Sequence, residues 1–146
     1  MKLPQRTKIL VEGDHKLLPG FAGQIRKNYV VHTERGAKKS LAMTKARDSV
    51  SFQPFYIGEV LMTECTVSIH DIFGFGAIMG EDYDRAYELA IVDAAFRAGL
   101  PETKDWIPLL EKEEKRIEIK HQEELALVLR TKVDFGDLEG PNDKRE

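Results

Sequence analysis

The sequence predicts an α+β protein in which an antiparallel sheet of about four strands packs against helices, with a helical N-terminus and a long C-terminal helix. Three observations lead to this fold class. β-Branched and aromatic runs between residues 28 and 80 are joined by short loops, which favours an antiparallel sheet over β-α-β units. Prolines and glycines divide the apolar clusters of residues 1–27 into two short helices. Two helical patterns occupy residues 81–130.

Length and composition indicate one domain. A chain of 146 residues with 42% hydrophobic residues can bury an apolar core without disulfides. We therefore expect a single domain over residues 1–130, followed by an extended tail over 131–146 that docks on a partner subunit. One cysteine excludes an intramolecular disulfide and a Cys-rich metal site on this chain. The absence of a long apolar run predicts a cytoplasmic protein with no membrane segment.

The charge is distributed unevenly along the chain. Residues 1–50 carry eleven basic and four acidic residues, whereas residues 51–146 carry eleven basic and twenty-one acidic residues. A basic N-terminal third could meet a phosphate ligand or an acidic partner, or it could be neutralised by the acidic part of the same molecule or of a dimer mate. The charge distribution alone does not distinguish these two interpretations.

The first strands are expected to form a basic hairpin. Residues 29–33 and 41–46 favour strands, and residues 35–39 favour a turn. The tip of this hairpin would carry Arg35, Lys38 and Lys39, which are candidate ligands for a phosphate. The basic tip lacks interleaved aromatic residues, and the isoelectric point is about 5.9, so nucleic-acid binding is disfavoured.

Two further strands follow. The apolar alternation from Phe55 to Ile69 changes phase near Gly58, which predicts a bend or bulge there. Residues 70–73 make the next turn, and residues 74–80 form a strand of small residues. The glycine spacing in Gly74-x-Gly76-x-x-x-Gly80 does not match a dinucleotide fingerprint or a phosphate loop.

The clearest helix follows Gly80. Asp82 is the expected N-cap, and Gly99 ends the helix. Asp93 lies on the apolar side of this helix. Because a buried carboxylate must be paired or hydrogen-bonded, Asp93 is expected to be an anchor to a backbone group or an arginine; the other reading is a functional acid.

The last helix is expected to begin near Trp106 and to end at about Arg130. Its narrow apolar stripe lies between many Glu and Lys residues, a pattern typical of a helix that packs on another chain or on one edge of its own domain. The stripe consists of Trp106, Leu110, Ile117, His121, Leu125 and Val128. On this pattern His121 is expected to be a core residue, and self-association through this helix or a sheet edge is expected.

No catalytic set can be singled out from the residues. The four histidines show no metal-ligand spacing, so no metal site is expected. Cys65 lies within an apolar strand and is expected to be a small core residue rather than a nucleophile.

Residues 55–96 resemble the PhnG subunits of the bacterial carbon–phosphorus lyase system. The resemblance rests on Gly58, Thr63 and Val67, on the Gly74–Gly80 run, and on the Asp82 to Ala94 segment, with a further likeness at Lys132-Val133-Asp134-Phe135. Arg85-Ala86-Tyr87 stands where the family usually has His-Ala-Glu, so the role of that histidine does not carry over, and Arg85 is only a candidate substitute. The motif positions to which we assign structural roles are Gly58, Thr63, Gly74, Gly80, Asp82, Asp93, Val133 and Phe135.

The resemblance implies a subunit of a multiprotein enzyme that contains PhnH, PhnI and PhnJ. Together with PhnH, PhnI and PhnL, such a subunit takes part in displacing adenine from ATP by a phosphonate, which yields α-D-ribose 1-methylphosphonate 5-triphosphate. ATP is then a substrate of the complex, and the iron–sulfur cluster and S-adenosylmethionine belong to another subunit. No cofactor is expected on this chain, and the chain alone is expected to be a homodimer without a complete active site.

A different class of function is the alternative. The basic N-terminal third also suits a stand-alone homodimeric module that binds a phosphorylated small molecule. Melting that depends on added phosphates or nucleotides would distinguish such a module from an assembly subunit.

Overall fold

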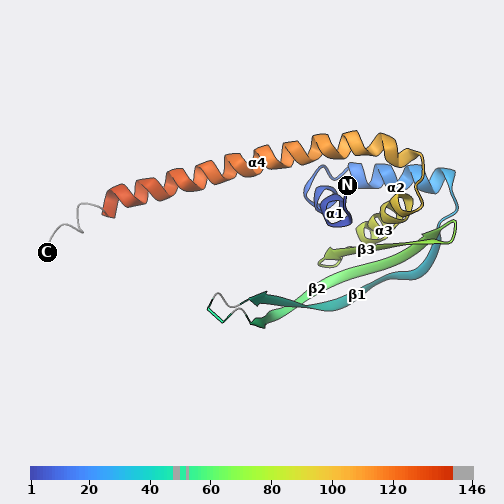
Figure 1. The fold of residues 1–146 in the computed structure, drawn as a ribbon, viewed down its shortest axis with the longest axis horizontal. Coiled ribbons are helices and arrows are strands. Elements are labelled where there is room, and N and C mark those ends of the chain that lie inside the picture. Colours follow the sequence, from blue (N-terminus) through green and yellow to red (C-terminus); the bar gives the residue numbers. More distant parts are fainter. Residues whose placement is uncertain (48–49, 52, 140–146) are drawn as a thin grey trace.

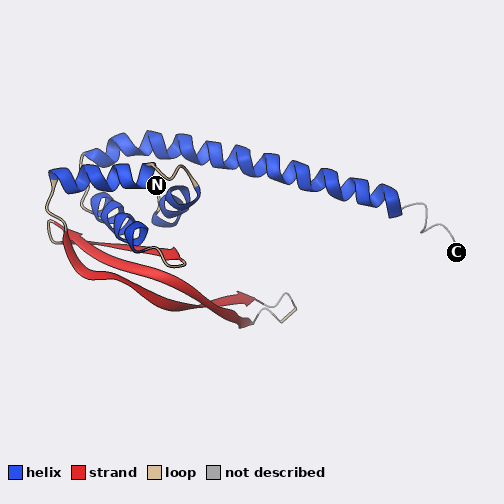
Figure 2. Cartoon of the chain, turned by 180° about the vertical axis from the view of Figure 1, so that it is seen from behind, coloured by secondary structure: helices blue, strands red, loops and turns tan. Residues whose placement is uncertain are grey.

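The computed structural model describes residues 1–47, 50–51 and 53–139. It is an α+β structure in which a sheet lies on one side, one helix covers the sheet, and further helices cover that helix (Figure 1). Seen from behind, the last helix extends far beyond this layered body (Figure 2). In chain order the elements are α1 (Leu3–Glu12), α2 (Leu17–Asn28), β1 (His32–Arg47), β2 (Pro54–Ile69), β3 (Ile72–Met79), α3 (Tyr83–Arg97) and α4 (Glu102–Glu139).

The helical lead consists of two short helices, as predicted. Helix α1 ends at Glu12, directly before Gly13, and α2 begins at Leu17 with Pro19 in its first turn, where a missing N–H is tolerated. Both helices turn apolar residues toward the core. The buried residues of α2 are Leu18, Phe21, Ala22 and Ile25.

The sheet has three strands in the described part of the chain, in the order β1-β2-β3 with antiparallel pairing, rather than the expected four. The two segments expected as separate strands, 29–33 and 41–46, contribute to one long strand, β1. No turn forms at residues 35–39. The pairing with β2 continues there because β1 absorbs the extra residues in register shifts between Thr33 and Arg35 and between Arg35 and Lys38.

The irregularity expected within β2 is confirmed, but the turn after it is shorter than the expected residues 70–73, because Ile72 and Phe73 already pair within β3. The register of β2 shifts between Gly58, opposite Thr44, and Tyr56, opposite Lys45, which is the irregularity that the change of phase predicts. A two-residue turn joins β2 to β3. Its residues His70 and Asp71 have φ values of 49° and 63°, the positive values that suit a tight hairpin with the twist of the strands.

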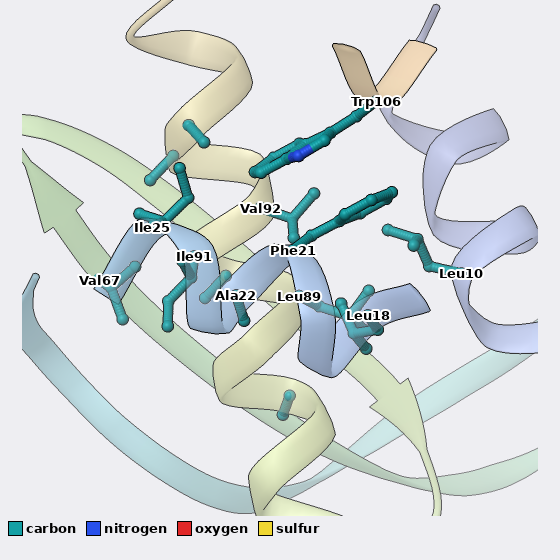
Figure 3. Packing of buried hydrophobic residues seen from close by; sticks show 14 of the residues in the cluster. Leu10, Leu18, Phe21, Ala22, Ile25, Val67, Leu89, Ile91, Val92 and Trp106 are labelled. Carbon is teal, nitrogen blue, oxygen red and sulfur yellow. The ribbon is translucent and has the colours of Figure 1, made fainter. Parts of the chain in front are cut away.

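The core lies between the sheet and α3 and continues between α3 and α2. Figure 3 shows Phe21 and Trp106 next to Val92 of α3. Ile25 and Val67 belong to the same buried cluster. The rings of Phe21 and Trp106 are stacked, with their centroids 4.6 Å apart. The indole N–H of Trp106 donates to Gln24, so this buried polar group is satisfied.

The ends of α3 follow the sequence signals. The Asp82 side chain accepts a hydrogen bond from the Arg85 backbone N–H at 3.1 Å, which is an N-cap contact. At the other end Gly99 has φ of 65°, the left-handed conformation that glycine adopts readily after a helix.

Helix α4 is longer than predicted and differently buried. It continues to Glu139, so residues 131–139 of the expected extended tail are helical, and Val133 and Phe135 lie on this helical segment. The rest of the expected tail, residues 140–146, lies outside the described residues. Trp106, Leu110 and Ile117 are buried, but the later members of the stripe are exposed. His121 is not a core residue: its side chain is 53% exposed and lies 3.8 Å from Glu12. The stripe is buried only as far as the body of the domain extends.

The described residues contain no helix that is both long and apolar enough to cross a membrane.

Candidate functional site

The glycine motif of β3 allows α3 to lie directly on the strand backbone. A Cβ on Gly74 would lie 2.3 Å from the Ala90 carbonyl oxygen, and a Cβ on Gly76 would lie 2.2 Å from the Ala86 carbonyl oxygen. Neither position has room for a side chain. Alanines on α3 complete this close approach from the other side. The motif therefore serves packing between helix and sheet, not the binding of a phosphate.

A buried threonine holds the connection between β3 and α3. Thr63 is fully buried; its hydroxyl donates to the Gly80 carbonyl at 2.6 Å and accepts from the Asp82 N–H at 3.1 Å. Gly80 has φ of 87°, which suits glycine. The capping carboxylate of Asp82 then occupies the helix N-terminus, so the three motif residues Thr63, Gly80 and Asp82 form one local structure.

Asp93 is the centre of a buried polar network. It is 2% exposed, and its carboxylate contacts the Arg6 guanidinium at 3.1 Å and the Arg97 guanidinium at 2.9 Å. The Phe75 backbone N–H donates to the same carboxylate at 2.9 Å. The carboxylate thus binds both an arginine and a backbone group, and it joins α1, β3 and α3.

Arg6, the partner of Asp93, makes further contacts with its guanidinium. Its guanidinium lies 4.1 Å from the centre of the Phe96 ring and also donates to the Met1 carbonyl. Burial lowers the pKa of Arg6, and the nearby Asp93 carboxylate acts in the opposite direction. With its charge paired and stacked, Arg6 connects the first helix to the core.

Arg85, at the position of the family's histidine, also makes contacts within the fold. It donates to the Leu10 carbonyl at 2.8 Å, and its guanidinium lies 2.7 Å from Nδ1 of His15. Its buried Nε has no partner among the described residues. On the next turn of α3, burial raises the pKa of Glu88, with a lowering contribution from Arg85. Arg85 thus joins α3 to the α1–α2 connection.

The three basic residues expected at a hairpin tip lie within β1 and do not converge. Arg35 and Lys38 pair with Thr66 and Glu64 on the face of the sheet away from α3. Lys39 pairs with Thr63 on the opposite face and lies 3.8 Å from Glu81. The prediction of one basic tip is therefore wrong, because β1 continues through the expected turn.

Two hollows adjoin α1. One, of about 420 Å³, lies between α1 and α4 and has polar walls over an apolar floor of Ile9, Ile117 and Leu125. The other, of about 600 Å³, is mainly apolar and lies between α1 and the edge strand β3. Both open on surfaces where a further protein element could pack.

The described residues contain no group of three or more His, Cys, Asp or Glu side chains that could hold a metal ion. Cys65 is buried, and its thiol lies 3.3 Å from the Arg35 carbonyl oxygen. Burial raises the pKa of this thiol, which disfavours the nucleophilic thiolate. Cys65 is therefore a core residue, as its place in the strand predicts.

Two residues of these networks, Arg6 and His15, were not predicted from the sequence. Arg6 lies three residues before Ile9, on the buried side of α1. A basic residue on an apolar helix face indicates a buried acidic partner, and this pattern could have predicted the pair with Asp93. His15 carried no comparable signal, since its contact with Arg85 spans seventy residues and depends on how α1 lies against α3.

Together, the fold and these contacts define a small α+β protein whose motif residues join its layers. The profile of the family described as phosphonate metabolism protein PhnG matches residues 4–139. The chain belongs to the PhnG family and so to the proteins of phosphonate metabolism. No curated protein matches the chain.

Proposed function

We propose that this chain is an assembly subunit of the carbon–phosphorus lyase core complex. With homologues of PhnH, PhnI and PhnL it would take part in forming α-D-ribose 1-methylphosphonate 5-triphosphate from ATP and a phosphonate, with release of adenine. PhnJ, the iron–sulfur cluster and S-adenosylmethionine belong to the same proposed assembly, with the cofactors on another subunit. The proposed location is the cytoplasm. Membership of the PhnG family supports this proposal.

The observation that carries a role in assembly is the exposed continuation of the α4 stripe. Leu110 and Ile117 are buried, whereas Leu125 and Val128 are 58% and 62% exposed on the continuation of that stripe. The hollow between α1 and α4 leads onto the same side of the helix. Exposed apolar residues rimmed by polar ones are typical of protein–protein contact sites. We propose this side of α4 as the surface that docks on another subunit.

The motif side chains are used in contacts within the fold. This supports a role as an assembly subunit that carries no complete active site of its own. Asp93 is saturated by Arg6, Arg97 and a backbone N–H, and Thr63 is saturated by the β3–α3 connection. Their chemistry is that of a fold held together by polar contacts.

A phosphate-binding module receives less support. Arg35 and Lys38 share one sheet face with Glu64, so an anion there would meet a carboxylate as well as two cations. Lys39 lies on the other face beside Glu81. A direct contact of these cations with ATP phosphates predicts that replacing all three with alanine weakens nucleotide binding by the full complex.

The test is affinity purification of the tagged chain from its native host starved of phosphate, with mass spectrometry of the recovered proteins. Homologues of PhnH, PhnI and PhnJ are the expected partners. The double variant Leu125→Glu/Val128→Glu is expected to lose them, because two carboxylates would be desolvated at the docking surface.

Val30→Glu is the matched control, since Val30 is an equally exposed apolar residue outside α4. It is expected to recover the same partners as the unmodified chain. Recovery of the tagged chain alone would contradict the proposed assembly. Full recovery with the double variant would contradict the proposed surface while leaving the assembly in place.

A further inference from the structure

Residues 118–131 of α4 have no cover from the described part of their own chain. Every described side chain from Glu118 to Thr131 is exposed, and the helix extends away from the layered body (Figure 1). Leu127 is 61% exposed within this segment. A helix this long and this exposed usually finds part of its stability in a contact with another helix.

One face of this segment carries an acid and a base at equal distances from a central apolar pair. Glu123, Ala126, Leu127 and Arg130 surround a shallow hollow of about 400 Å³ on the helix surface. Spacings of three, four and seven residues place these four side chains on one side of an α-helix. An acid and a base therefore flank a central apolar pair on a single face.

This arrangement is complementary to itself under a two-fold rotation. If two α4 helices lie antiparallel and the axis passes between Ala126 and Leu127, Glu123 of each helix faces Arg130 of the other. Ala126 then lies opposite Leu127, a small residue against a large one. A two-fold contact uses the same patch on both subunits, so two identical ion pairs form at once.

The charge order selects the antiparallel arrangement. A parallel pair in register would place Glu123 against Glu123 and Arg130 against Arg130, which is repulsive. Opposite charges thus meet on both sides of the proposed axis.

We propose that this chain forms a two-fold homodimer in which the Glu123–Arg130 faces of two α4 helices pack antiparallel. The face lies on the side of α4 roughly opposite Leu125, because two residues advance the helix by about 200°. A second copy on this face would leave the hollow between α1 and α4 open. The homodimer contact is therefore separate from the surface proposed for other subunits, and it does not depend on that proposal.

Sedimentation equilibrium of the full chain over a range of concentrations tests the contact. The unmodified chain is expected to be a dimer in equilibrium with monomer, since a short helix pair buries less surface than a standard interface. Glu123→Arg and Arg130→Glu each convert both ion pairs to like charges, so each is expected to raise the dissociation constant about tenfold. The double variant Glu123→Arg/Arg130→Glu restores both pairs and is expected to return the constant to about its original value.

Glu124→Arg is the matched control. It changes the net charge as Glu123→Arg does, but it lies about 100° further round the helix. Circular dichroism of each variant verifies that α4 stays helical. A monomer at all concentrations, an equal effect of Glu124→Arg, or a double variant as weak as the single ones would each overturn the proposal. A dimer that none of these variants weakens would overturn it too, by placing the contact elsewhere.

Discussion

Helices α3 and α4 are built from opposite kinds of sequence and have opposite surroundings. In α3 every residue from Leu89 to Ala95 is buried, because the sheet lies on one side and α2 on the other. In α4 every described residue beyond Ile117 is exposed. Small apolar residues dominate α3, and charged residues dominate α4.

The comparison shows that α3 stabilises the fold, whereas much of α4 offers surface for contacts with other chains. Burial all round allows α3 to lie on the glycines of β3, but it also forces the buried carboxylate of Asp93 into an ion-pair network. Helix α4 is anchored in the body through Trp106, Leu110, Glu113 and Ile117 of its first half. Residues 118–131 contribute surface rather than core. Substitutions in the two helices should therefore differ in effect.

The largest effect is expected for Asp93→Ala. Removing the carboxylate leaves the buried Arg6 guanidinium and the Phe75 N–H without their acceptor, which costs about 4 kcal/mol of unfolding free energy. Urea denaturation followed by circular dichroism measures the loss. Arg97→Ala is the control: Arg97 is half exposed, so its ion pair contributes at most about 1 kcal/mol. Equal losses for the two variants would contradict a buried anchoring role for Asp93.

Gly76→Ala tests the close approach of α3 to β3. A methyl group at this position would meet the Ala86 carbonyl oxygen and the Ala90 nitrogen, both within 2.5 Å, so helix and strand must separate. We expect a loss of about 3 kcal/mol, measured by thermal and urea unfolding. Gly58→Ala is the control, since a Cβ there would meet no atom within 4 Å. An unchanged stability of Gly76→Ala would mean that α3 does not lie directly on the strand.

Glu113→Gln is expected to have a smaller effect that depends on pH. Hydrogen bonding from Arg116 lowers the pKa of Glu113, and the Asp14 N–H contributes in the same direction. Because the pKa is lower in the folded state, this stabilisation is present above the ordinary carboxyl pKa of about 4.3 and is lost as the pH falls through the folded value.

The variant is therefore expected to be about 1 kcal/mol less stable than the unmodified chain at pH 6, with the difference shrinking below pH 4. Urea midpoints measured from pH 6 to pH 3 give this difference directly. A constant difference across that range would show that the Glu113 charge does not stabilise the start of α4.

Much of the fold could be predicted from local signals. The cap at Asp82, the left-handed Gly99 and the phase change at Gly58 each indicate an element boundary or bulge within a few residues, and the structure has all three. The burial of Asp93 follows from its place on an apolar helix face. The pairing of that carboxylate follows from the cost of an isolated buried charge.

Predictions that depended on distant neighbours were less successful. Gly36 and the adjacent charged residues suggested a turn, but β2 is long enough to pair with β1 through that region, so the chain stays extended. His121 continues the spacing of a buried stripe, yet it lies at the rim of the body beside Glu12 of α1, where the apolar core does not cover it. Local pattern cannot show where a neighbouring element ends.

By itself, the sequence determined the fold class, the order of helices and strands after residue 50, and the motif that relates the chain to the PhnG family. Only the tertiary structure decided that Arg35 and Lys38 lie on the sheet face opposite Lys39, that Arg6 reaches Asp93, and that residues 118–131 of α4 are exposed. The physical reason is one of range. Caps, turns and hydrophobic periodicity act between residues near in sequence, whereas strand register and burial depend on segments far apart in the chain, such as Arg6 and Asp93, which are separated by 87 residues.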